Sequence, residues 1–182
     1  MAGQTRFEEF VMPHLDAGYN LARWLTRNSD DAEDVVQEAC LRALKYIGTL
    51  VGNDARAWFL TVIRNTFYDW CKRNRPAQLD PVDESVIEEL VDERRVDPEQ
   101  AALHSAESRL LADAIAQLPL AFRETLILRE LEDLSYKEIA RITGVPVGTV
   151  MSRIARARSL LQRSVLAQAI RGEPQEVQHE LR

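Results

Sequence analysis

The sequence has little of what builds metal sites and disulfide frameworks. Its 182 residues include two cysteines, Cys40 and Cys71, and neither belongs to a CxxC pair. The three histidines, at positions 14, 104 and 179, are scattered along the chain. Because both kinds of site need clustered ligands or paired thiols, we expect no metal, no disulfide and no other cofactor.

Long apolar runs are also missing. The longest stretch without Asp, Glu, Lys or Arg runs from Ile142 to Ser152, much shorter than the roughly 20 residues that a membrane-spanning helix requires. The beginning, MAGQTRFEEF, has no apolar core of the kind found in signal peptides. We therefore expect a cytoplasmic protein with no membrane insertion.

Patterns of catalysis are absent as well. The sequence contains no recognisable nucleophile and base, no glycine-rich phosphate loop and no metal-ligand spacing. We also find no segment with credible strand alternation, so we predict an all-α protein that is not an enzyme.

Charge is present in blocks. The net charge is −6, but ten acids and two arginines lie between residues 76 and 107, whereas residues 56–75 hold five basic residues and one acid. The acidic block also contains three prolines and little helical periodicity, which predicts an extended linker. We therefore expect two compact helical modules, residues 1–75 (the N-terminal module) and 106–172 (the C-terminal module), joined by an acidic linker, 76–105, and followed by a polar tail, 173–182. A single interior shared by both modules, with an arginine-bearing helix packed inward, would contradict this picture.

The N-terminal module begins with two predicted helices. The first covers about residues 7–25 and is interrupted near Pro13, which lacks the amide N–H that continues a helix. The second, DDAEDVVQEACLRALKYI, places apolar residues at threes and fours, with Asp30 and Glu33 as its expected capping pair. Its predicted buried stripe is Ala32, Val35, Val36, Ala39, Ala43, Leu44 and Ile47. Its predicted exposed face is Asp34, Gln37, Glu38, Leu41 and Lys45.

A third helix, DARAWFLTVIRNTFYDWCKRN, mixes aromatic and basic residues after a glycine-containing loop at 47–54. Most of the aromatic rings are expected in the core, with the cations keeping the surface soluble. Alternatively, one or two rings, with Asn65 and nearby cations, form a platform for unpaired bases, since stacking contributes roughly 1–3 kcal/mol per base. Periodicity alone does not separate these interpretations.

The C-terminal module carries a sharper pattern in SYKEIARITGVPVGTVMSRIARARSLL. Ser135 and Glu138 fit a capping box, Gly144 suits a tight turn, and Pro146 suits the start of a second helix. The residues predicted to be buried on that second helix are Val147, Val150, Ile154, Ala157 and Leu161. Before it, AESRLLADAIAQLPLAFRETLILRELEDL predicts two more helices that separate near Leu118-Pro119.

The opposite face of the second helix gathers Thr149, Ser152, Arg153 and Arg156. From Ile139 to Gly172 there are six arginines and no acids. A basic face alone would indicate only a solvated amphipathic helix. Together with the cap, the turn and the core spacing, it favours a helix-turn-helix that enters the DNA major groove.

Four segments carry a family resemblance: DAEDVVQEACLRAL, AWFLTVIRNT, LPLAFRETLILRELEDLSYKEIA and GVPVGTVMSRIARAR. In this order they resemble bacterial RNA polymerase sigma factors of the extracytoplasmic-function group. The resemblance implies a protein that binds core RNA polymerase and directs initiation at promoters with minus-10 and minus-35 elements.

The resemblance also implies roles for particular residues. Asp34, Gln37, Glu38 and Leu41 would contact the clamp helices of the largest catalytic subunit. Trp58, Arg64 and Asn65, with the loop 47–54, would hold the melted minus-10 DNA. Thr149, Ser152, Arg153 and Arg156 would read the minus-35 element, the rest of the C-terminal module would sit on the polymerase flap, and the acidic linker would follow the polymerase channel.

Two further expectations come with the family. An anti-sigma protein is expected to hold such a sigma factor inactive. Met151 departs from the family pattern, which often has a basic residue there, and a thioether cannot bind phosphate. The alternative interpretation is a stand-alone helix-turn-helix regulator whose N-terminal helices sense a ligand or bind a partner; a helical adaptor that binds only proteins is disfavoured by the acid-free basic helix.

Overall fold

The computed structural model describes residues 2–50, 52, 54–79 and 106–172, and these are helical apart from short turns and loops. This confirms the all-α prediction for the described part of the chain. Most of the predicted linker and the whole predicted tail lie outside the described residues. The elements in chain order are α1 (Ala2–Phe10), η1 (Met12–His14), α2 (Leu15–Thr26), α3 (Ser29–Tyr46), η2 (Ile47–Thr49), α4 (Ala55–Asn74), η3 (Pro76–Leu79), α5 (Ala106–Gln117), α6 (Leu120–Glu130), α7 (Tyr136–Thr143) and α8 (Val147–Gly172).

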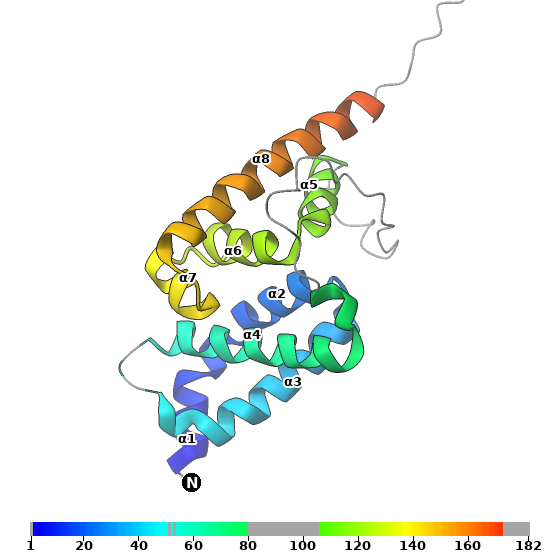
Figure 1. Ribbon diagram of the computed structural model, residues 1–182. Coiled ribbons are helices and arrows are strands. Elements are labelled where there is room, and N and C mark those ends of the chain that lie inside the picture. Colours follow the sequence, from blue (N-terminus) through cyan, green and yellow to red (C-terminus); the bar gives the residue numbers. More distant parts are fainter. Residues whose placement is uncertain (1, 51, 53, 80–105, 173–182) are drawn as a thin grey trace, which may run out of the picture.

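The N-terminal module packs α2, α3 and α4 against one another (Figure 1). The predicted interruption at Pro13 is the 3-10 turn η1. Helices α2 and α4 come very close at Gly18, where an added Cβ would lie 2.7 Å from the Phe59 ring. Helix α2 ends at Arg27, which adopts a left-handed conformation with φ 60°.

Two local predictions, one for this module and one for the start of the linker, are corrected. Helix α3 is capped by Asn28, whose side chain accepts a hydrogen bond from the Asp31 amide, and not by Asp30. The start of the predicted extended linker, Pro76–Leu79, forms a 3-10 turn.

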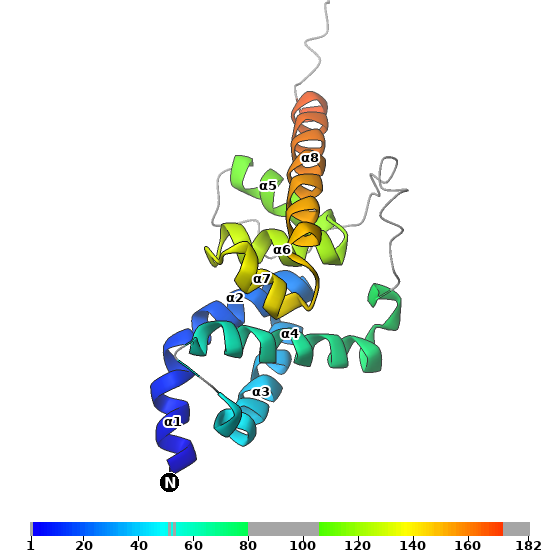
Figure 2. The same cartoon turned by 60° about the vertical axis from the view of Figure 1, so that its left-hand side comes forward.

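The C-terminal module packs α8 against α5, α6 and α7. In both views α8 extends well beyond the other helices (Figures 1 and 2). The predicted break between α5 and α6 falls at Leu118-Pro119, where Pro119 sits just before α6.

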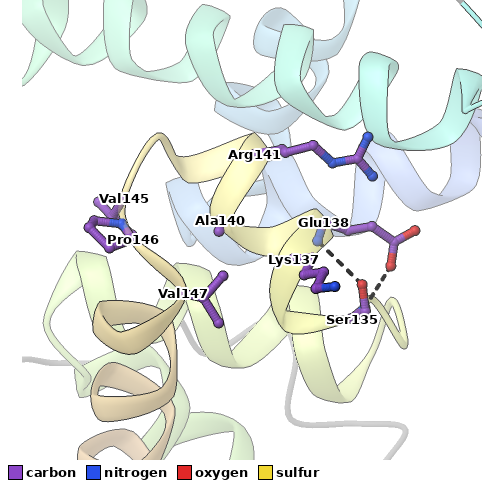
Figure 3. A pocket seen from close by; sticks show the side chains of 8 residues that line it. All are labelled: Ser135, Lys137, Glu138, Ala140, Arg141, Val145, Pro146 and Val147. Atoms are coloured by element: carbon purple, nitrogen blue, oxygen red, sulfur yellow. Dashed lines mark hydrogen bonds between the residues drawn. The ribbon is translucent and has the colours of Figure 1, made fainter.

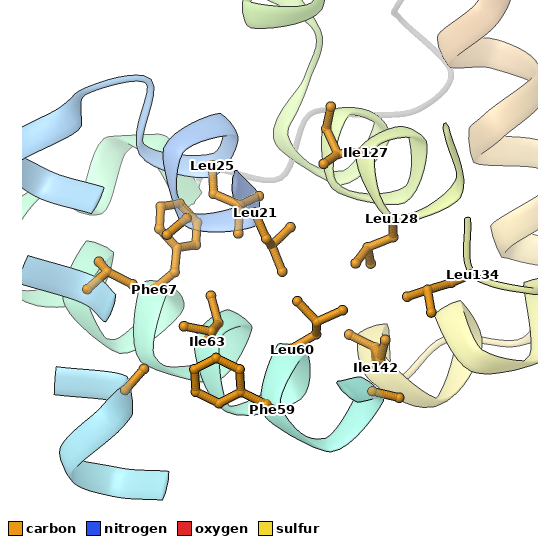
Figure 4. Close-up of a cluster of buried hydrophobic side chains, with 14 of the residues drawn as sticks. Leu21, Leu25, Phe59, Leu60, Ile63, Phe67, Ile127, Leu128, Leu134 and Ile142 are labelled. Atoms are coloured by element: carbon orange, nitrogen blue, oxygen red, sulfur yellow. The ribbon is translucent and has the colours of Figure 1, made fainter. Parts of the chain in front are cut away.

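The two modules are in contact along α2 and α4 on one side and α6 and α7 on the other (Figure 2). Leu21, Leu25 and Leu60 from the N-terminal module belong to the same buried cluster as Leu128 and Ile142 from the C-terminal module (Figure 4). Burial of each of these leucine side chains stabilises the folded protein by about 1.5–3 kcal/mol. The picture of two separate interiors is therefore wrong in this respect, because apolar residues on α6 and α7 find partners on α2 and α4. We call this packing the closed arrangement.

Candidate nucleic-acid interface

The helix-turn-helix has the predicted local structure. The Ser135 amide donates to the Glu138 carboxylate at 2.7 Å, and the Glu138 amide donates to the Ser135 hydroxyl at 3.3 Å, which completes a capping box. These bonds to Ser135 lower the pKa of Glu138 below its ordinary value. Gly144 ends α7 with φ 72°, a conformation that glycine adopts without steric cost.

The first turns of α8 have an apolar side and a polar side. Val150, Ile154 and Ala157 are buried, although Val147 is exposed, contrary to its predicted place in the core, and Leu161 is half-buried. On the polar side, Ser152 and Arg156 are exposed, while Thr149 and Arg153 are half-buried. The Ser152 hydroxyl donates to the Thr149 carbonyl at 3.0 Å. The basic face of α8 is thus not packed inward.

A shallow hollow of about 770 Å³ lies beside the turn of the helix-turn-helix (Figure 3). It is formed by α7, the turn and the beginning of α8, and none of the four residues expected to read DNA lines it. The lining residues are Ser135, Lys137, Glu138, Ala140, Arg141, Val145, Pro146 and Val147.

The three α4 residues expected at the minus-10 DNA are not gathered on one open surface. Asn65 is exposed, and Trp58 is half-buried against the apolar core. Arg64 is 18% exposed and turns toward the C-terminal module, where its Nε lies 2.6 Å from Glu124 Oε1. Its guanidinium also stacks over the Tyr68 ring at 4.4 Å.

Glu124 is the carboxylate that receives Arg64, and it is 1% exposed. Burial raises the pKa of Glu124, an effect that the charge of Arg64 and its hydrogen bond oppose. Tyr68 donates a weak hydrogen bond of 3.4 Å to the same carboxylate, and burial raises the pKa of this phenol. A charge removed from water to this extent requires a partner. Arg64 of the other module supplies the ion pair, and the charge of Arg153 on α8 acts in the same direction.

Further polar contacts join the modules, and the sequence analysis did not identify them. Arg56 pairs with the buried carboxylate of Glu132, and Arg141 on α7 pairs with Asp54 at 2.9 Å. Figure 3 shows the Arg141 side chain extending toward α4. For the buried charges of α6 the sequence does offer a signal, because Arg123 and Glu124 are adjacent in LAFRETLIL, a segment whose other positions are mostly apolar.

Arg123 is the second of these buried charges. Its guanidinium donates to the carbonyls of Ala116 and Leu118 at the end of α5, and to the carbonyl of Leu25 in α2. Arg27 donates to the Ala116 carbonyl as well, at 3.1 Å. Burial lowers the pKa of Arg123 to about 9, and the carbonyls at two helix ends offset part of the cost of its charge.

Four of the five residues predicted on the exposed face of α3 are exposed, Lys45 among them, and only Glu38 is half-buried. Asp34 and Gln37 are exposed, and Leu41 is 70% exposed. Leu44, predicted in the buried stripe, is 44% exposed and lies three residues after Leu41, so it extends this face.

Glu38 is held in place by two arginines. Arg42 and Arg73 donate to its two carboxylate oxygens, and Arg42 also pairs with Asp69 at 2.7 Å. Burial acts to raise the pKa of Glu38, but the hydrogen bonds from the arginines outweigh it and lower the pKa. Glu38 therefore connects α3 to α4.

Within the described ranges, no group of three or more histidine, cysteine, aspartate and glutamate side chains could hold a metal ion. In the same part of the chain, no helix combines the length and the apolar character needed to cross a membrane.

Family models match both modules. Residues 10–76 match Sigma-70 region 2, and residues 108–161 match Sigma-70, region 4. An ECF RNA polymerase sigma-E factor of Haemophilus influenzae is 37% identical over 151 residues, which cover 80% of this chain and 79% of that protein. The chain belongs to the extracytoplasmic-function group of the sigma-70 family.

Two further relatives match this sigma factor over most of its length. The ECF RNA polymerase sigma factor SigE of Mycolicibacterium smegmatis is 32% identical over 161 residues, and the match spans 88% of this chain but 62% of that longer protein. The sigma factor RpoE of Bartonella quintana, solved in complex with the anti-sigma factor NepR, has a TM-score of 0.69 at 28% identity. This comparison covers 88% of the present chain and 96% of the Bartonella chain, so it includes both modules.

Proposed function

We propose that this sigma factor binds core RNA polymerase through α3 and directs it to promoters whose minus-35 and minus-10 elements contact α8 and α4. The observation that carries the proposal is the helix-turn-helix, in which a capped α7 and a glycine turn present the polar side of α8 outward.

At the minus-35 element, α8 supplies the side chains suited to the major groove. The groove admits one helix, whose N-terminal residues reach the base edges. Ser152 and Arg156 are exposed on that part of α8, with Thr149 and Arg153 beside them. Arginines there pair with guanine edges or neutralise phosphates, and the exposed Met151 offers only an apolar contact.

At the minus-10 element, α4 and the loop before it hold melted DNA. Asn65 is exposed for hydrogen bonds to an unpaired base, and Trp58, seven residues earlier on the helix, supplies a half-buried ring. Flipping a base out of the duplex costs a few kcal/mol, which stacking and edge contacts repay. Arg64 would take part once it is released from Glu124.

The polymerase surface is the face of α3. Asp34, Gln37 and Leu41 present an acidic and apolar surface, which Leu44 extends. Glu38 supports this face from its ion pairs to Arg42 and Arg73.

An anti-sigma protein is the expected regulator. The Bartonella relative was solved with such a partner, and its similarity to this chain extends over both modules. A partner that covers the α3 face would compete directly with the polymerase.

The stand-alone regulator is not favoured, since both modules match sigma-70 regions. The test is run-off transcription from genomic fragments with reconstituted holoenzyme. Specific initiation that requires this protein supports the proposal, and its absence contradicts it.

A matched set of variants tests the minus-35 contact. We expect Arg153→Ala and Arg156→Ala each to weaken promoter binding by holoenzyme about tenfold, because each removes a base or phosphate contact. For a lost phosphate contact the salt dependence should also flatten by about one unit of slope. Arg163→Ala is the control, because Arg163 is exposed on the same helix two turns beyond Arg156. Unchanged promoter binding in both test variants would refute the assigned role of α8.

A further inference from the structure

The contacts between the modules combine an apolar centre with ionic groups. Leu128 packs in the shared cluster, while Glu124 and Glu132 are almost completely buried against arginines of α4. Buried ion pairs add little net stability, because the desolvation cost can exceed the attraction. Interfaces between domains that move relative to each other are more polar than permanent cores. The composition of this interface therefore suits a contact that opens.

Two of the ion pairs between the modules join an arginine of α4 to a carboxylate of the C-terminal module. Arg64 and Arg56 both lie on α4, the helix proposed to hold melted DNA, and each is paired with a carboxylate of the C-terminal module. A carboxylate that accepts hydrogen bonds from a guanidinium occupies the place that a phosphate oxygen or a base acceptor would take. Arg141 of the helix-turn-helix is in turn paired with Asp54, which caps α4.

The arginine of α4 at the module contact is covered, whereas the polar side of α8 is exposed. Arg64 is 18% exposed and lies under Glu124, whereas Ser152 and Arg156 on α8 face solvent. DNA cannot reach the Arg64 guanidinium while Glu124 of α6 is paired with it.

We propose that the closed arrangement is a self-inhibited state of this sigma factor, in which Glu124 and Glu132 substitute for nucleic acid on Arg64 and Arg56. Opening of the modules exposes α4 and allows it to bind single-stranded DNA. The identity of the nucleic acid rests on the proposed function, but the closed arrangement does not.

The Arg56–Glu132 pair allows a charge-swap test of opening, because the distance between the modules is measured without DNA. Glu132→Arg places two guanidinium groups opposite each other and should open the modules. Arg56→Glu places two carboxylates there and should do the same from the other side, which covers the case in which Glu132→Arg fails to fold. The double variant Arg56→Glu/Glu132→Arg restores the attraction and should close them again.

The matched control is Glu130→Arg. Glu130 is on α6 and pairs with Arg158 within the C-terminal module. This variant makes the same charge change two residues away, but it leaves the ion pairs described between the modules intact.

Opening is measured by energy transfer between dyes in the free, full-length protein. The dyes are attached at Glu33→Cys on α3 and Gln162→Cys on α8, both exposed positions, in a background with Cys40→Ala and Cys71→Ala. We expect high transfer in the parent and in Glu130→Arg, low transfer in both single variants at the 56–132 pair, and recovery in the double variant. Circular dichroism checks that each variant is folded. Low transfer already in the parent, or unchanged transfer in both folded single variants, would overturn the proposal.

Exposure of α4 is measured by anisotropy with a fluorescein-labelled single-stranded DNA of mixed sequence. If about nine-tenths of the free protein is closed, opening raises the apparent affinity about tenfold. We therefore expect Glu132→Arg to bind about tenfold more tightly than the charge-matched Glu130→Arg, and Arg64→Ala in the Glu132→Arg background to remove that gain.

Equal DNA affinity of Glu132→Arg and Glu130→Arg, with the modules open, would refute self-inhibition. Transcription by the wild-type holoenzyme is judged separately, so failure of this proposal and failure of the proposed function give different results.

Discussion

At the scale of single residues, neighbouring side chains on the proposed polymerase surface of α3 differ in what they contact. Leu41 stands out on α3 with 70% of its surface exposed, while Glu38 on the same face is held by Arg42 and Arg73. Changes at Glu38 therefore alter both the proposed polymerase surface and the packing of α3 on α4. A change at Leu41 alters the proposed polymerase surface without altering the packing of α3 on α4.

We expect Leu41→Ala to weaken binding to a clamp-helix fragment of the polymerase largest subunit about tenfold, since burial of a leucine side chain in an interface contributes about 1.5–3 kcal/mol. The free energy of unfolding should change by less than about 0.5 kcal/mol, because the side chain is not part of the core. Titration calorimetry measures the affinity and urea denaturation measures the stability. Leu111→Ala on α5 is the control, with a leucine 46% exposed in the other module; equal affinity of the two variants would remove Leu41 from the polymerase contact.

At the scale of elements, the sequence predicts helices well where local chemistry specifies them. Pro13, Pro119, Gly144 and the Ser135–Glu138 box fix breaks and ends, because each acts through its own backbone or through a neighbour three residues away. The prediction is wrong where two local solutions compete. At the start of α3 both Asn28 and Asp30 are residue types that cap helices, and Asn28, which has an extended backbone, is the cap.

The capping box offers a test at this scale. Ser135→Ala removes the hydroxyl that accepts the Glu138 amide and should lower the free energy of unfolding by about 1 kcal/mol. Ser159→Ala is the control, because Ser159 is exposed within α8 and alanine is favoured in helix interiors. Chemical denaturation of both variants measures the difference. A loss as large in Ser159→Ala would show that the box does not stabilise the helix-turn-helix.

At the scale of the whole molecule, sequence patterns predicted two helical modules but not their contact. Periodicity identifies an apolar face without identifying what covers it. The sequence analysis made no prediction for the buried charges of Arg123 and Glu124, since partners of both lie far away in the sequence, at Leu25 and Arg64. The candidate site has the same limit: the α8 face was predicted from the sequence, whereas the covering of Arg64 by Glu124 depends on the packing of one module on the other.

A shared interior has a thermodynamic consequence. We expect the wild-type protein to unfold in one cooperative transition, with calorimetric and van't Hoff enthalpies in a ratio close to unity, because the modules stabilise each other. In Glu132→Arg the modules should unfold separately and give two transitions. Differential scanning calorimetry measures this, and two transitions in the wild type would show that the shared cluster does not couple the modules.

Arg27 combines two demands at one position. Its left-handed backbone conformation at the end of α2 has the lowest steric cost for glycine, the residue that most often ends helices in this way. Its guanidinium, however, reaches the Ala116 carbonyl of the other module. Replacement of Arg27 by glycine should therefore stabilise the end of α2 and at the same time remove a hydrogen bond between the modules. A protein engineer who makes this change should obtain a more stable helix in a more readily activated regulator.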